Sequence, residues 1–141
     1  MSSITDQDSL STPVALSSAR VYDSLKQSQD VVSTLAPLVK ESHSADATDD
    51  VLEIRELLTK HGGTDQARAL AKKFLETNPQ HPRALFEWAA VLAQEDKEKD
   101  AISLLGQAIS SGGAPYKAMA RTDKRFDEIR DQRSFRKLVS P

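Results

Sequence analysis

Two segments of the chain match each other at a spacing of 34 residues, and this internal repeat limits what the chain can fold into. The first segment spans about residues 48–81 and the second about residues 82–115. Within each segment, apolar residues recur at intervals that place them on one face of a helix. The paired positions are Val51 with Leu85, Ile54 with Trp88, Leu58 with Leu92, Ala67 with Ala101, Ala71 with Leu105 and Phe74 with Ala108. Each segment therefore predicts two helices that pack on each other.

Helix-breaking residues mark where the predicted helices begin and end. His61-Gly62-Gly63 separates the two helices of the first segment, and Asn78-Pro79 ends the second of them. The next helix begins near Pro82, and Gly112-Gly113 ends the helix that follows it. Ala67 and Ala101 fall where the two helices of a pair would cross most closely. Alanine suits this position because a larger side chain would push the two helices apart. No segment predicts a strand, so the fold class is all-α.

The segment PRALFEWAAVLAQEDKEKDAISLLGQAI resembles a tetratricopeptide repeat (TPR). It carries the family's signature spacing at Leu85, Trp88, Ala89, Leu92, Ala101, Leu105 and Ala108. The preceding segment is similar to the same family at Val51, Ile54, Leu58, Gly62, Ala67, Phe74 and Pro79. The resemblance implies two TPR-like repeats over residues 48–115, built as antiparallel helix pairs in a short α-α superhelix.

The flanking segments predict additional parts. Residues 1–12 are polar and predict a disordered N-terminus. Residues 13–40 predict one N-terminal helix, which Pro37 kinks or ends near Leu35, and residues 41–50 predict a connector.

Residues 116–141 resemble a tail that follows the last repeat in some TPR proteins, and they predict C-terminal capping helices that cover the end of the array. The residues that carry this resemblance are Asp123, Phe126, Ile129, Arg130, Phe135 and Leu138.

The resemblance implies that the first helix of each repeat lines a concave groove that binds a peptide or helix of another protein. The family's groove positions fall on Leu52, Glu53, Glu56, Lys60, Arg83, Phe86, Glu87, Ala90 and Gln94. Leu52 and Phe86 are apolar on the face that the internal helix contact does not need, so they are candidate anchor residues. The alternative is that the N-terminal helix lies in this groove and covers both side chains.

Other functional interpretations remain open at this stage. The N-terminal helix, with Leu25, Val32, Leu35 and Val39, could form a homodimer or dock on another subunit, or the chain could be a regulatory accessory of an enzyme. Trp88 occupies a signature position, which favours core packing over a binding hot spot. Basic residues crowd the C-terminal tail, and the acids among them favour local ion pairs on a solvated face over a binding face.

Composition excludes several function classes. The net charge of −2 argues against nucleic acid as a partner, because phosphate binding needs a basic surface. The chain has no cysteine and no apolar run long enough to span a membrane. His43, His61 and His81 lie in predicted connectors without carboxylates at ligand spacing. We therefore expect a cytoplasmic protein-binding protein that is not an enzyme, with no catalytic residues, no metal and no cofactor.

Overall fold

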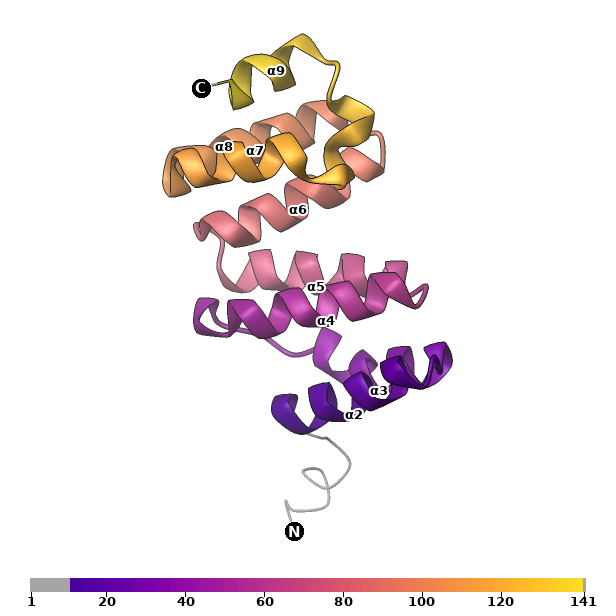
Figure 1. The fold of residues 1–141 in the computed structure, drawn as a ribbon. Helices are drawn as coiled ribbons and strands as arrows, with labels where there is room; N and C mark the ends of the chain where they lie inside the picture. Colours follow the sequence, from indigo (N-terminus) through magenta and orange to yellow (C-terminus); the bar gives the residue numbers. More distant parts are fainter. Residues whose placement is uncertain (1–10, 141) are drawn as a thin grey trace. The chain divides into compact units, whose positions relative to one another are not determined.

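The computed structural model describes residues 11–140, and the regular elements in that range are all helices (Figure 1). The elements are α2 (Thr12–Ser24), α3 (Ser28–Val39), the 3-10 helix η1 (Ala45–Ala47), α4 (Thr48–Lys60), α5 (Thr64–Thr77), α6 (Pro82–Gln94), α7 (Glu98–Gly112), α8 (Ala114–Thr122), the 3-10 helix η2 (Lys124–Ile129) and α9 (Arg133–Val139). The prediction of an all-α fold is confirmed. None of these helices is long and apolar enough to cross a membrane.

The described part of the chain divides into two compact units, unit 1 up to Lys73 and unit 2 from Phe74 onward. Unit 1 contains α2, α3, η1 and α4 with the first part of α5, and unit 2 contains the last turn of α5 with α6 to α9. The predicted disorder of residues 1–12 lies outside the described residues for residues 1–10, whereas Ser11 precedes α2 directly and Thr12 is its first residue.

The prediction of one helix over residues 13–40 is wrong, because this segment forms two helices that lie side by side, α2 and α3 (Figure 1). Between them, Lys26 adopts a left-handed conformation with φ of 58°. The amide of Gln27 then donates to the carbonyl of Tyr22 at 2.9 Å, and the amide of Lys26 donates to the carbonyl of Asp23 at 3.0 Å. This paired pattern is the Schellman motif, which ends a helix and reverses the chain.

The same turn ends α4 and α6. Gly62 follows α4 with φ of 81°, and Gly63 donates to the carbonyl of Leu58 at 2.6 Å. Asp96 follows α6 with φ of 62°, and Lys97 donates to the carbonyl of Leu92 at 3.0 Å. Each of the three helices is therefore followed by one left-handed residue. Only one of these residues, Gly62, is the glycine that such a position favours.

The helix pair of residues 12–39 also follows the residue pattern of the two predicted repeats. Val31, Leu35 and Leu38 of α3 precede Ala67, Ala71 and Phe74 of α5 by 36 positions, and all six side chains are buried. Ala19 of α2 precedes Ala89 of α6 by 70 positions, the sum of this spacing and the 34-residue spacing of the two predicted repeats, and both alanines are fully buried. Residues 12–39 thus form a helix pair, α2 and α3, in place of the single helix predicted.

Pro37 lies inside α3, and the helix continues through it to Val39. A proline costs a helix one hydrogen bond, and here the break falls in the last turn, where Leu38 and Val39 are still buried. The expected connector over residues 41–50 is shorter than predicted, because it contains η1 and ends where α4 begins at Thr48.

The core of unit 2 lies between α6 and α7, which run side by side, and the C-terminal helices cover it (Figure 1). Ala101, Leu105 and Ala108 of α7 are fully buried against α6. Trp88 is partly buried and packs against the same core, in agreement with the core interpretation of this residue. Phe126 and Phe135 are buried in this core as well, as expected of capping residues.

We predict that Lys26→Gly stabilises the protein. A non-glycine residue in the left-handed conformation is less favourable than glycine by roughly 1 kcal/mol, and the side chain of Lys26 is exposed, so replacing it with glycine removes little burial. The free energy of unfolding, measured by urea titration, is expected to rise by up to about 1 kcal/mol. Lys26→Ala is the control, because alanine keeps the strain, and an equal gain from both variants would contradict this account.

Candidate protein-binding site

The groove positions predicted in α6 are largely inaccessible. Phe86 and Ala90 are fully buried and Glu87 is 2% exposed. The expectation that Phe86 faces an open groove is therefore wrong. The physical reason is that the C-terminal helices, which were expected to cover the end of the array, lie over this face of α6.

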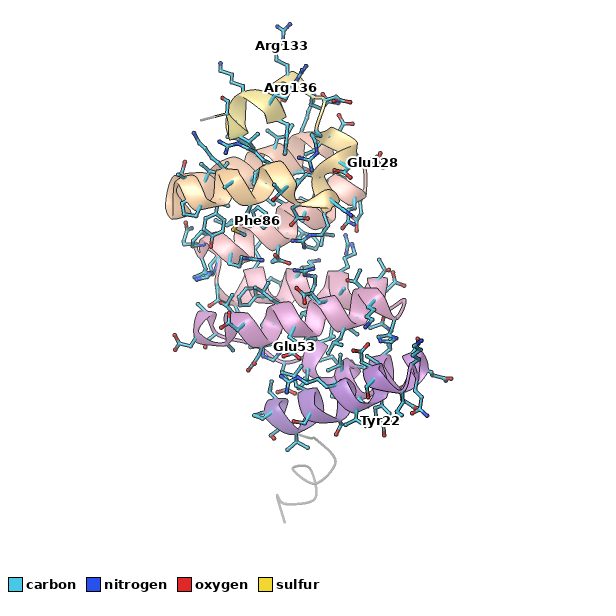
Figure 2. The ribbon with its side chains drawn as sticks, viewed as in Figure 1. Tyr22, Glu53, Phe86, Glu128, Arg133 and Arg136 are labelled. Carbon is cyan, nitrogen blue, oxygen red and sulfur yellow. The ribbon has the colours of Figure 1, made fainter. Side chains whose placement is uncertain are left out.

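Aromatic side chains from the C-terminal helices surround Phe86, which Figure 2 labels on α6. Its ring centroid lies 5.8 Å from that of Tyr116 in α8 and 5.3 Å from that of Phe126 in η2, in edge-to-face geometry. Phe126 in turn lies 5.7 Å from Phe135 of α9. Such aromatic pairs add to the energy of apolar burial, so this row of rings joins α6 to all three C-terminal elements.

Glu87 is the buried anion of the same face, and two arginines bind it. Arg125 of η2 forms a two-pronged pair with its carboxylate, at 2.9 Å from Nη1 to Oε1 and 3.1 Å from Nη2 to Oε2. Arg83 donates to Oε2 at 3.1 Å from one turn earlier in α6. Asp123 also binds Arg125, at 2.7 Å.

Burial disfavours the charged form of Arg125, but the hydrogen bonds and the negative charges of Asp123 and Glu87 outweigh it. The net effect raises the pKa of Arg125 above its usual value. The guanidinium of Arg125 also lies 5.9 Å from the centroid of the Phe86 ring, and that of Arg83 lies 5.5 Å from it. The predicted anchor Phe86 is therefore enclosed by rings and cations of its own unit. At the far end of α6, Gln94 is exposed.

The groove positions predicted in α4 lie in unit 1, and α2 binds two of them. The carboxylate of Glu53, which Figure 2 labels on α4, accepts from Nε and Nη2 of Arg20 in α2, at 2.5 and 2.6 Å. These hydrogen bonds, together with the charge of Arg20, lower the pKa of Glu53. Lys60 pairs with Asp23 of α2 at 2.8 Å. Leu52 is partly buried, and Glu56 stays exposed.

Asp23 also accepts from His61, and this contact joins the α2–α3 turn to the end of α4. The distance from Nε2 of His61 to Oδ1 of Asp23 is 2.7 Å, and Nδ1 of the same ring lies 2.7 Å from the hydroxyl of Ser28. The hydrogen bond from Lys60 makes the largest contribution to lowering the pKa of the Asp23 carboxyl, followed by the hydrogen bond from His61. The sequence placed His61 in a connector and gave it no partner. Within residues 11–140, no His, Cys, Asp and Glu side chains form a cluster that could hold a metal ion.

The outer face of α2 carries the large apolar side chains that are exposed in residues 11–140. Val14 is 49% exposed, Val21 is 55% exposed and Leu25 is 59% exposed. These positions are separated by 7 and 4 residues, so they lie on one stripe of the helix. Ala15, Leu16 and Ala19 point the other way and are buried. We define the α2 face as this stripe with the serines beside it, namely Val14, Ser17, Ser18, Val21, Ser24 and Leu25.

The sequence contained the signal for this face, but the wrong helix boundary hid it. When residues 13–40 were treated as one helix, Leu25 joined a stripe with Val32, Leu35 and Val39. In the structure Leu35 and Val39 are buried in α3, whereas Leu25 is exposed at the end of α2. The separation of Leu25 from those residues depends on the turn at Lys26.

The basic residues of the C-terminal tail fall into two groups. Arg125 and Arg130 bind acidic residues of their own segment, and Lys117 and Arg121 donate to the carbonyls of Ser140 and Val139. A second group is exposed, and Figure 2 shows two of its members, Arg133 and Arg136, extending outward from α9. The expectation of local ion pairs thus holds for part of the tail only.

Comparisons of the chain with protein-family models, with curated proteins and with solved structures found no match. The likeness to TPR repeats therefore stays a prediction from the sequence pattern.

We predict that Arg125→Met destabilises unit 2. The change leaves the carboxylate of Glu87 buried with one of its cations removed, and such a loss costs about 3 kcal/mol or more. Urea titration followed by circular dichroism measures the effect. Arg133→Met is the matched control, because Arg133 is exposed and lies outside the Glu87 cluster. Equal stability of the two variants would show that the pair with Glu87 contributes nothing.

We predict that the Asp23 contacts make stability depend on acid pH. Because folding lowers the pKa of Asp23, its contribution is complete above the unfolded value of about 4 and is lost as the pH falls through the lower folded value. The free energy of unfolding, measured from pH 6 downward, is expected to decline less in Asp23→Asn than in the wild type. Asp30→Asn, on the exposed part of α3, is the control, and parallel curves for all three proteins would refute the prediction.

Proposed function

We propose that this chain is a protein-binding module and that the α2 face is its contact surface. The observation that carries the proposal is the exposed apolar stripe of Val14, Val21 and Leu25. Single exposed aliphatic residues are ordinary on protein surfaces, but several that align on one helix face are typical of a docking site. An amphipathic helix that binds through residues spaced in this way is a common mode of protein recognition.

The energy available from this stripe is sufficient for a specific but modest interaction. Each of the three side chains is about half exposed, so covering it completely would contribute on the order of 1 kcal/mol. The three contributions together are enough for a modest interaction, which further contacts between the partner and residues around the stripe would strengthen.

Charge pairing within unit 1 supports an apolar rather than an ionic mode of recognition. Arg20 and Asp23 are the charged residues of α2, and both are bound to α4, through Glu53 in one case and through Lys60 and His61 in the other. Neither charge points into the stripe. A partner surface that is itself uncharged and apolar matches the α2 face best.

The resemblance to TPR repeats supports the same class of function, because proteins of that family act as adaptors, scaffolds and chaperone-like binders. The groove that the resemblance implies contains Phe86, Glu87 and Ala90, and these residues are excluded from the proposed contact surface because they are buried. The proposal thus follows the alternative in which the N-terminal segment docks on a partner. It also includes a cytoplasmic location, for which the cysteine-free sequence is suited, and a role that does not involve catalysis.

The test is affinity capture from a native lysate with three purified proteins: wild type, Val21→Glu/Leu25→Glu and Gln29→Glu/Ser33→Glu. The first double variant places two charges in the stripe, and the second places two charges on the exposed part of α3. We expect the wild type and the α3 variant to capture the same partners and the α2 variant to lose them, by tenfold or more in apparent affinity. Circular dichroism verifies that all three are folded.

Retention of every partner by a folded α2 variant would rule out the α2 face as the contact surface. Loss of the partners by the α3 variant alone would move the site to α3.

A further inference from the structure

The α2 face has no charged side chain, and its polar groups are small. Serines occupy the positions between the aliphatic residues, at Ser17, Ser18 and Ser24. The hydroxyl of Ser24 donates to the carbonyl of Val21 at 2.8 Å, so this polar group is satisfied within its own helix. A second helix can therefore approach this face closely without leaving a buried charge unpaired.

The order of large and small residues along the face is complementary to itself. If two copies of α2 lie antiparallel about a two-fold axis, position 14 of one copy is opposite position 25 of the other, and position 18 is opposite position 21. Val14 then packs against Leu25, and Val21 packs against the small Ser18. At the edges of the face two large side chains therefore meet each other, and at the centre of the face a large side chain meets a small serine.

Neutrality is the second condition for pairing of identical surfaces, because two copies of a charged face repel each other. The α2 face meets this condition because Arg20 and Asp23 are bound to α4. Lys26 lies just past the end of the face, and in this arrangement it is opposite Pro13, which is uncharged.

We propose that the partner of the α2 face is the same face of a second copy of this chain, arranged antiparallel about a two-fold axis. This inference rests on the proposed function, since it names the occupant of the contact surface assigned there. The interface contains few apolar residues, so the dimer dissociates on dilution.

The first test is sedimentation analysis of the purified full chain from about 5 to 500 µM, a range that spans weak association. The wild type is expected to shift from a mass of 15.5 kDa toward twice that mass as the concentration rises. Val21→Glu is expected to stay monomeric throughout, because the two-fold axis brings two added charges close together. Ser33→Glu on α3 is expected to behave as the wild type.

The second test exploits the lack of cysteine in the chain, which makes any introduced thiol the sole one. Val14→Cys and Leu25→Cys, mixed under mild oxidation, are expected to form a disulfide-linked pair of the two variants. Either variant alone is expected to stay uncrosslinked, because the antiparallel arrangement separates identical positions by about 16 Å along the helix. Crosslinking of Val14→Cys with itself would overturn the antiparallel arrangement.

A wild type that remains monomeric at every concentration would overturn the inference. If such a monomer still captures another protein from the lysate through Val21 and Leu25, the proposed function stands and only the identity of the partner changes. If capture and self-association are both insensitive to Val21→Glu/Leu25→Glu, the proposed function fails as well.

Discussion

The fold depends on a backbone conformation that L-amino acids usually avoid. A helix can be followed directly by an antiparallel partner only if the chain reverses within about two residues, and the left-handed residue of the Schellman motif provides that reversal. Lys26, Gly62 and Asp96 adopt it after α2, α4 and α6. Two of them are not glycine, so tertiary packing must compensate for the strain. The buried residues of the helices that follow, such as Val31 and Ala101, lie a few positions beyond each turn and supply that packing.

Charged residues have two different structural roles in the two units. In unit 2 a carboxylate is buried at Glu87 and is neutralised by Arg83 and Arg125, so its cost of burial is offset by cations from its own helix and from the segment that covers it. In unit 1 the charges of α2 stay near the surface but are bound to α4. In unit 2 the paired charges accompany a closed aromatic core around Phe86. In unit 1 the pairing leaves the outer face of α2 without charge.

The residue pattern of α6 predicts which side chains share a helix face, but it does not predict whether that face is accessible. The family resemblance implied that Phe86 lies on an open face of α6, whereas that face is buried. Helical periodicity states on which side of a helix Phe86 lies, whereas it contains no information on which distant segment covers that side. Tyr116 and Phe126 lie 30 and 40 residues further along the chain, and only folding brings their rings to Phe86. The α2 face was missed for the opposite reason, since a local error in the helix boundary grouped Leu25 with residues that are buried.

The sequence by itself determined that this protein is helical and where most of its helices lie. Proline at the start of α6, glycine after α4 and α7, and the 34-residue spacing of apolar residues act locally, so they can be interpreted without coordinates. Tertiary structure decided which surfaces remain available. The turn at Lys26 has no local signature, because a lysine enters the left-handed region only when packing of α3 on α2 compensates for it. That packing separates Leu25 from Leu35, covers Leu35, and leaves Val14, Val21 and Leu25 facing outward.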